Sequence, residues 1–439
     1  MKHLRMMLSG WLALGLATAD AAPLRILAIG DSLSEEYAFE LTFSAPESDP
    51  TNANVRNWPE LLRIYRSTEA SLGPYEPTAF SYTDLRDAGH EWNFGIPGMT
   101  LKNWVFLLGT DDPFKSWGDE PLGAGYYVTR SALIDQLPSA EVVVILLGSN
   151  DLKQDYDNIF NNTEPANFYT NITARIASIR NWVRQVRPTV PIVISTIPDV
   201  GATPVVAGTY SDPVRRASAR AKIASLNQTI VTQAASRGDK VARLDTLANQ
   251  VMDQSPYQIN GTVLTLAGDP ENPPNHLFCR DNFHVSTIGQ AMIANQVLAA
   301  FSAATGRATT LFANRDILSL AGLNPDAPYN SWTASYPGLG GPGADDDGDG
   351  IPNLVEYVLG ISPRRAVSPF RFSGVGTLHF SPTITGLQYA SLSVLESPDL
   401  AAWTAVPSNR ITVGSDGSWT IAPTGSLRGF YRLRASPNP

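Results

Sequence analysis

Five residues in four short stretches of this 439-residue sequence could together carry out acyl transfer. Ser32 follows an apolar run, and a serine hydroxyl becomes a useful nucleophile only when a base lies within hydrogen-bond reach. His284 is the candidate base, because Asp281, three residues earlier, can bend back to the imidazole and hold the required tautomer. Gly98 and Asn150 add a backbone N–H and a side-chain amide, which can stabilise the negative charge that develops on a substrate oxygen.

The elements that must position these residues can be read from apolar runs and helical spacing. Buried strands are expected at 26–29, 142–147 and 192–197, and helices at 58–65, 172–186, 223–234 and 287–301. This alternation predicts a doubly wound α/β sheet, in which the carboxyl ends of parallel strands form one crevice. Residues far apart in the sequence can meet there. We expect Asp151, next to Asn150, to be a helix N-cap.

These stretches resemble the sequence blocks of the GDSL, or SGNH, hydrolases. Their counterparts here are Gly30-Asp31-Ser32-Leu33-Ser34, Asn93-Phe94-Gly95-Ile96-Pro97-Gly98-Met99-Thr100, Gly148-Ser149-Asn150-Asp151 and Asp281-Asn282-Phe283-His284. The resemblance covers about residues 24–304. It implies a flavodoxin-like, three-layer α/β/α domain with a mainly parallel sheet, and an ester hydrolase that needs no cofactor for catalysis.

The resemblance also implies a role for each matching residue. Ser32 would be the nucleophile, with His284 and Asp281 as the rest of the triad, and Gly98 and Asn150 would be oxyanion donors. Gly98 is chosen over Gly95 because it directly precedes an X-Thr pair.

The amino end has the three-part plan of a secretory signal peptide. Lys2 and Arg5 precede an apolar run at 6–16 and small residues up to Ala21, so residues 1–21 are expected to be removed from a secreted protein. Extracellular, periplasmic and cell-surface locations all remain open. The apolar run is too short to span a bilayer. A net charge of −9 argues against nucleic acid as a partner, because a phosphate binder needs a basic surface.

An acidic stretch near residue 350 has the spacing of a calcium-binding loop. Oxygen donors occupy the positions that such a loop uses, and the expected ligands are Asp345, Asp347, Asp349, the Ile351 carbonyl, Asn353 and Glu356. The stretch resembles the single calcium loops that join domains in secreted bacterial proteins. We expect a structural Ca²⁺ here; the alternative is a solvated acidic turn.

The remaining sequence predicts how the chain is divided. We expect a hydrolase domain at 22–305, a linker at 306–344, the calcium loop and a helix at 345–363, and a small all-β module at 364–439. In that module, Trp403, Trp419 and Tyr431 could stack on polysaccharide, but core packing explains them equally well.

Three functions remain open from the sequence. Aromatic residues between Trp104 and Tyr127 could form a platform for a sugar ring, and with secretion and an accessory module this favours an ester of an acylated carbohydrate. The substrate would be a small molecule or a polysaccharide. The same aromatic residues could bind an acyl chain in a lysophospholipase, lipase or thioesterase, and they could equally be core anchors. An alternative of another class is a catalytically silent binding or adhesion protein.

Overall fold

The computed structural model describes residues 22–37, 55–78, 81–86, 88–109, 125–266, 274–373, 377–423 and 429–439. The predicted signal peptide lies outside these ranges, as do the aromatic residues Phe114 and Trp117. Within these ranges, no helix is long and apolar enough to cross a membrane.

Residues 24–305 form an α/β domain that is built around one parallel sheet. Its strand order is β2-β1-β6-β7-β8, and β5 also pairs with β1. The strands are β1 (Leu24–Gly30), β2 (Ala70–Ser71), β5 (Asn93–Gly95), β6 (Val142–Leu146), β7 (Ile192–Ser195) and β8 (Lys240–Ala242). Ile26 to Gly30 of β1 lie opposite Val142 to Leu146 of β6, so the loops after these two strands leave the sheet at the same edge. The predicted mainly parallel sheet is confirmed.

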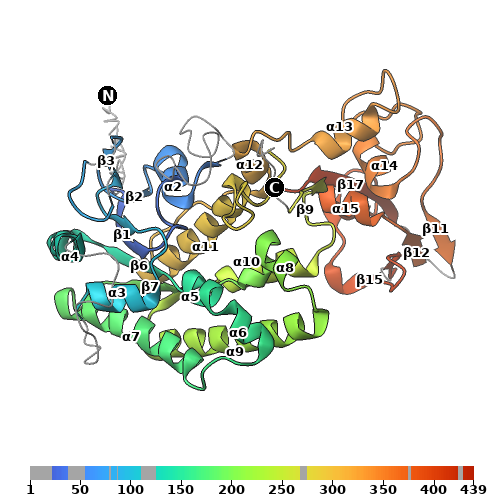
Figure 1. The fold of residues 1–439 in the computed structure, drawn as a ribbon. Coiled ribbons are helices and arrows are strands. Elements are labelled where there is room, and N and C mark those ends of the chain that lie inside the picture. Colours follow the sequence, from blue (N-terminus) through green and yellow to red (C-terminus); the bar gives the residue numbers. More distant parts are fainter. Residues whose placement is uncertain are drawn as a thin grey trace, which may run out of the picture.

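Helices cover both faces of the sheet (Figure 1). In β1, Ile26 and Ala28 pack into one hydrophobic cluster while Leu27 and Ile29 pack into the other, as the alternation of a strand requires. One layer contains α2 (Trp58–Tyr65), α10 (Leu244–Asp253) and α11 (Thr287–Thr305). The other contains α3 (Leu101–Leu107), α4 (Gly125–Gln136), α7 (Phe168–Val186) and α9 (Pro213–Ser236). The three-layer α/β/α prediction is therefore confirmed.

Short elements complete this domain. They are β3 (Tyr75–Glu76), β4 (Gly89–His90), η3 (Leu137–Ser139), α5 (Ser149–Gln154), α6 (Tyr156–Asn161), η4 (Val200–Ala202), α8 (Pro204–Thr209), β9 (Gln258–Ile259) and β10 (Thr262–Val263).

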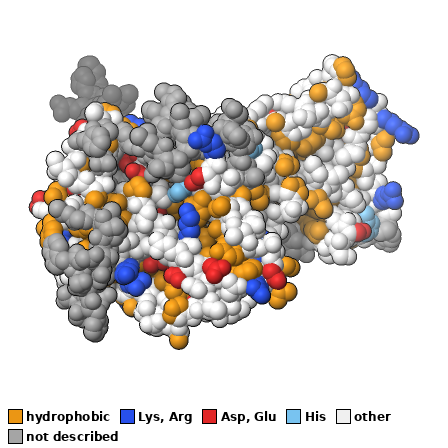
Figure 2. Space-filling view, viewed as in Figure 1, with side chains coloured by type: hydrophobic (Ala, Val, Ile, Leu, Met, Phe, Trp, Pro, Cys, Tyr) orange, Lys and Arg blue, Asp and Glu red, His pale blue; other side chains and the backbone are white. Residues whose placement is uncertain are grey.

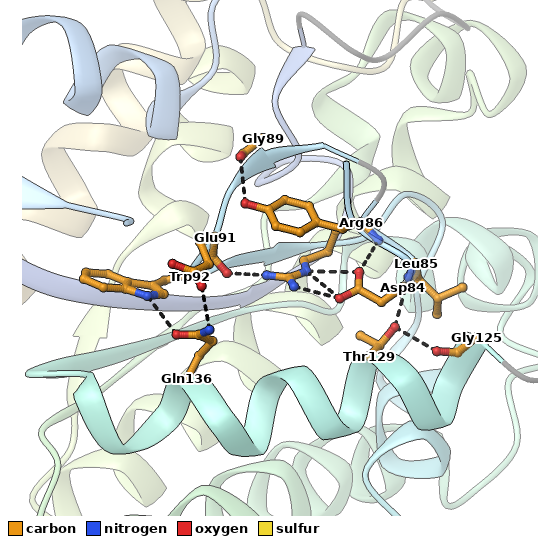
Figure 3. A network of polar contacts seen from close by, with 10 residues as sticks. Asp84, Leu85, Arg86, Gly89, Glu91, Trp92, Gly125, Thr129 and Gln136 are labelled. Carbon is orange, nitrogen blue, oxygen red and sulfur yellow. Dashed lines mark hydrogen bonds and ion pairs between the residues drawn. The ribbon is translucent and has the colours of Figure 1, made fainter. Parts of the chain in front are cut away.

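A polar network fastens the segment before β5 to helix α4 (Figure 3). The Arg86 guanidinium forms an ion pair with Asp84 at 2.7 Å and also donates to the Glu91 carbonyl. The Trp92 indole donates to the Gln136 side chain at 3.1 Å, and Gln136 donates in turn to the Glu91 carboxylate at 2.7 Å. These contacts hold the chain that leads directly into β5 and Gly98.

The segment 306–344, predicted as a linker, contains two packed helices. Helix α12 (Asn314–Leu320) places Ile317 and Leu318 in the same hydrophobic cluster as α11. Helix α13 (Ala327–Thr333) places Tyr329 in the core of the C-terminal region, residues 327–439. This segment is rich in Ala, Gly and Pro, and its two helices are too short for an apolar spacing that would predict them.

The C-terminal region, residues 327–439, has two antiparallel sheets. One has the order β11-β12-β16-β15 and the other β14-β13-β17. The strands are β11 (Arg371–Ser373), β12 (Thr377–Phe380), β13 (Ala390–Ser397), β14 (Thr404–Ala405), β15 (Ile411–Val413), β16 (Trp419–Ile421) and β17 (Phe430–Pro437). A single-turn helix, η5 (Ser408–Arg410), precedes β15. The predicted strands are present.

The predicted β module at 364–439 is present as these two antiparallel sheets, and helices complete its core. Helices α14 (Asn353–Leu359) and α15 (Ile384–Tyr389) pack with α13 against the strands. The ring of Tyr389 stacks on that of Tyr329 with centroids 6.0 Å apart, and it meets Tyr357 edge-on at 5.4 Å. Trp419 and Tyr431 pack against this core, and the Arg432 guanidinium lies 4.3 Å from the Trp403 ring centroid.

Asn260, in the turn between β9 and β10, connects the α/β domain to the C-terminal region. Its side-chain nitrogen donates to the carbonyls of Asn438 and Pro439, at 3.1 Å each, and its oxygen accepts from Asn314 at 3.1 Å. The C-terminus therefore lies against the α/β domain (Figure 1).

Candidate active site

The structure brings Ser32, His284 and Asp281 into one hydrogen-bonded chain. Ser32 lies in the turn that follows β1, and its Oγ is 2.7 Å from Nε2 of His284, 252 positions away. His284 Nδ1 lies 2.5 Å from Asp281 Oδ2. An ionised carboxylate only accepts, so Nδ1 carries the proton and Nε2 is left to accept from the serine hydroxyl.

Asp281 is held by its own loop as well as by the imidazole. Its second oxygen accepts from the backbone N–H groups of Phe283 and His284, at 3.0 Å each. Asn282 has a φ of 60°, a left-handed conformation that Asn tolerates, and this bend lets Asp281 face His284. Burial would raise the pKa of Asp281, but the hydrogen bond and charge of His284 and the two N–H groups bring the pKa below its ordinary value.

Gly98 and Asn150 lie together at the same edge of the sheet. The Asn150 side-chain amide donates to the carbonyl of Met99 at 3.1 Å, which leaves its second N–H for another acceptor. Gly98 is exposed with a φ of 72°, and a Cβ added there would meet no atom within 4 Å. A Cβ at Gly95 would lie 2.4 Å from the Glu35 backbone nitrogen. Gly95 thus serves close packing, whereas Gly98 borders open space.

Asp151 has a role that the sequence did not indicate. The residue at the N-cap of α5 is Gly148, so the expected N-cap function of Asp151 was wrong. Its Oδ2 instead accepts from the backbone N–H of Leu101 at 2.8 Å, at the start of α3, and Oδ1 lies 3.7 Å from the Arg175 guanidinium. Burial raises the pKa of Asp151 to about 6. Asp151 therefore ties the Asn150 turn to the helix that follows Gly98.

Asp31, next to Ser32, is a second buried carboxyl group. It is only 1% exposed, and Oδ1 accepts from the backbone N–H of Leu33 at 3.0 Å. Among the described residues its Oδ2 has no hydrogen-bond partner. Burial, with a smaller contribution from the charge of Asp151, raises the pKa of Asp31 to about 7.

The aromatic residues proposed for the cleft divide between core and surface. Trp104 is fully buried and its indole donates to the Gly30 carbonyl at 3.1 Å, so it anchors α3 to the end of β1. Tyr126 is buried and contacts Phe106 edge-on at 5.3 Å. Tyr127 is 52% exposed.

The acidic loop gathers carboxylates in front of helix α14. One oxygen from each of Asp345, Asp347 and Asp349 lies within 4.8 Å of the others. Glu356 is fully buried, and neither of its carboxylate oxygens has a hydrogen-bond partner among the described residues. Burial first, and then the negative charges of the four nearby aspartates, raise the pKa of Glu356 to about 7.

The two other expected ligands flank this cluster. Ile351 lies inside the loop, and its N–H donates to Asp349 at 2.9 Å. Asn353 begins α14; its amide nitrogen donates to Asp346 at 2.7 Å, and its oxygen has no partner in the part of the chain that the structure describes. Unpartnered buried oxygens of this kind fit a hard cation such as Ca²⁺.

The family model of the GDSL-like lipases and acylhydrolases matches residues 26–297. The chain belongs to this family. As a GDSL acylhydrolase it is an ester-hydrolysing enzyme. No curated protein is similar enough to this sequence to be matched to it.

The solved structures that are similar to this GDSL acylhydrolase include two carbohydrate esterases. A carbohydrate esterase family 3 protein from Talaromyces cellulolyticus is 13% identical, with a TM-score of 0.33 over 65% of this chain and 100% of that one. The Clostridium thermocellum family 3 carbohydrate esterase is 17% identical, with a TM-score of 0.32 over 63% of this chain and 94% of that one. These values are too low to transfer a substrate.

Proposed function

We propose that this protein hydrolyses carboxylic esters through an acyl-enzyme formed on Ser32. The observation that carries the proposal is the continuous chain from Ser32 Oγ through His284 to Asp281. His284 Nε2 takes the hydroxyl proton as Oγ attacks the ester carbonyl, and Asp281 stabilises the imidazolium that forms. The N–H groups of Gly98 and Ser32 and the free amide N–H of Asn150 stabilise the oxyanion.

The remaining steps use the same groups in reverse. The imidazolium of His284 gives its proton to the departing alcohol, the ester bond breaks, and the acyl group stays on Ser32. His284 then takes a proton from water, which attacks the acyl carbonyl, and finally returns a proton to Ser32 Oγ as the acid leaves. In this mechanism Ser32 provides the nucleophile, and His284 provides the base and the acid of both steps.

We further propose that the alcohol part of the substrate is a carbohydrate and that the protein is secreted. The predicted signal peptide and the accessory C-terminal module support this. The catalytically silent alternative is disfavoured, because a binding scaffold has no need to keep Ser32, His284 and Asp281 in hydrogen-bond contact. The alternative of an enzyme for long acyl chains differs from our proposal in chain-length preference.

The test compares wild type with Ser32→Ala on p-nitrophenyl esters and on acetylated xylan. The matched control is Ser178→Ala, which removes a serine hydroxyl from the exposed side of α7. We expect the first variant to lose at least a thousandfold in kcat and the control to match wild type. Equal activity of Ser32→Ala and wild type, or no turnover of any ester by wild type, would overturn the proposal.

We also propose that the loop 345–356 holds a structural Ca²⁺. Asp345, Asp347, Asp349 and Glu356 would supply carboxylate oxygens, with Asn353 and the Ile351 carbonyl completing the site. The unpartnered carboxylate of Glu356 supports this, because a fully buried acid without hydrogen bonds is costly unless a cation is beside it. The ion would join α14 to the acidic loop and has no part in the reaction.

A further inference from the structure

An apolar cavity lies beside the candidate triad, between η4, α10, α11 and the loop that carries His284. Its volume is about 90 Å³. Apolar side chains of α10 and α11 form much of its wall, among them Ala248, Val251, Met292 and Ile293. Figure 2 shows hydrophobic side chains gathered on this face of the molecule around α8 and α10.

The cavity reaches the catalytic residues through their neighbours in the chain. Leu33 follows Ser32, Ser149 precedes Asn150, and Phe283 and Val285 flank His284; all four line the cavity. Three of the four loops that meet at the carboxyl edge of the sheet thus contribute to the wall. The cavity therefore lies directly beside the loops that carry Ser32, Asn150 and His284.

The chemistry of the wall selects between the two halves of an ester. Two of the polar side chains in the wall have partners within the chain: Asp199 accepts from the Gly201 N–H at 2.8 Å, and Thr203 donates to the Val200 carbonyl at 2.7 Å. A sugar inside would leave its hydroxyl groups without partners, which is costly away from water. A hydrocarbon chain has no such cost.

We propose that this cavity binds the acyl chain of the substrate and that the preferred acyl group is longer than acetyl. The proposal rests on the ester hydrolysis assigned to Ser32 and deepens it. A volume of about 90 Å³ holds roughly six water-sized groups, and therefore a straight chain of about four to six carbon atoms. The alcohol, carbohydrate or otherwise, stays outside, on the open side of Gly98.

The first experiment measures kcat/KM of wild type on p-nitrophenyl acetate, butyrate, hexanoate and decanoate. Each methylene that enters the cavity should raise kcat/KM about fourfold, which corresponds to about 0.8 kcal/mol per buried methylene. The gain should end near hexanoate, because the cavity is then full.

Variants of α10 then locate the chain. Ala248→Leu fills the cavity from its wall, so kcat/KM for hexanoate should fall at least tenfold while the value for acetate stays within about twofold. Gln250→Leu places the same side chain on the exposed side of α10 and is the matched control. Val251→Ala enlarges the cavity and should move the optimum to a longer chain, which keeps the test valid if Ala248→Leu folds poorly.

The outcomes separate this proposal from the one on which it rests. If wild type prefers acetate through Ser32, or if neither α10 variant changes the ratio of hexanoate to acetate, ester hydrolysis stands and the acyl cavity is refuted. A steady rise through decanoate contradicts the cavity as the end of the acyl site and favours the lipid-directed alternative. If Ser32→Ala remains active, both proposals fail.

Discussion

Removing calcium should destabilise the C-terminal region, and the repulsion within the acidic loop gives the physical reason. Three aspartates hold oxygens within 4.8 Å of one another. At that separation each pair repels by about 1 to 4 kcal/mol, depending on how well water screens it. Glu356 adds a fourth carboxylate, fully buried behind the other three. A divalent cation would relieve this repulsion and would occupy the unpartnered oxygens of Glu356 and Asp347.

The expected change in melting temperature follows from linkage. An ion present at a hundred times its Kd stabilises the folded state by about 2.7 kcal/mol. For a unit of roughly 100 residues, that corresponds to a fall in Tm of about 10 to 20 °C when the ion is removed. The Tm of the C-terminal region should therefore fall by this amount when excess calcium is replaced by EDTA. Differential scanning calorimetry of the full chain measures it.

Variants make this prediction specific. Asp347→Asn removes one charge from the cluster and should abolish most of the rise in Tm that calcium causes. Asp416→Asn, in a turn of the same C-terminal region, should retain that rise. Ester turnover should be unaffected by EDTA, since the loop lies outside the hydrolase domain. An unchanged Tm in EDTA, or an equal calcium response in both variants, would refute the cation site.

Three further predictions concern the α/β domain. Burial raises the pKa of Asp31 from 3.8 to about 7, so its contribution to stability is complete below pH 4 and is lost as the pH rises to about 7. The free energy of unfolding of wild type should therefore fall by at most about 4 kcal/mol over this range, and Asp31→Asn should remove this fall. Urea unfolding of both proteins at pH 4.5 and 8 measures it. Asp281→Asn should lower kcat roughly a thousandfold with little change in KM or Tm, because the amide favours the wrong imidazole tautomer; an undiminished kcat would remove Asp281 from the triad. Asn260→Ala leaves Asn314 and the C-terminal carbonyls without these partners, so it should lower the free energy of unfolding by about 1 to 3 kcal/mol. The control Asn330→Ala changes an exposed side chain of α13 and should leave the free energy of unfolding unchanged.

The sequence was informative where chemistry follows a buried strand. The apolar run of β6 and the helical spacing of α7 predicted both elements, because each buries one continuous set of side chains. The turns after β1 and β6 were then correctly placed at one edge of the sheet. The helix predicted after the calcium loop is present as α14, and Gly360 directly after it has the left-handed conformation typical of a helix end.

What the sequence missed depends on contacts between distant segments. Asp151 binds the backbone of Leu101, 50 positions away, and no local pattern encodes that contact. The cavity beside His284 draws its wall from five separate parts of the chain, so only the folded structure reveals it. Helices α13 and α15 have seven and six residues, which is too short for their spacing to stand out from loop composition.

The central claim is that Ser32 becomes acylated, and mass spectrometry of the protein mixed rapidly with p-nitrophenyl hexanoate tests it most directly. Our account predicts one added hexanoyl group within the first turnover, carried by the peptide that contains Ser32, and no such adduct in Ser32→Ala. An acyl group on any other residue, or hydrolysis by wild type through no covalent intermediate, would contradict it.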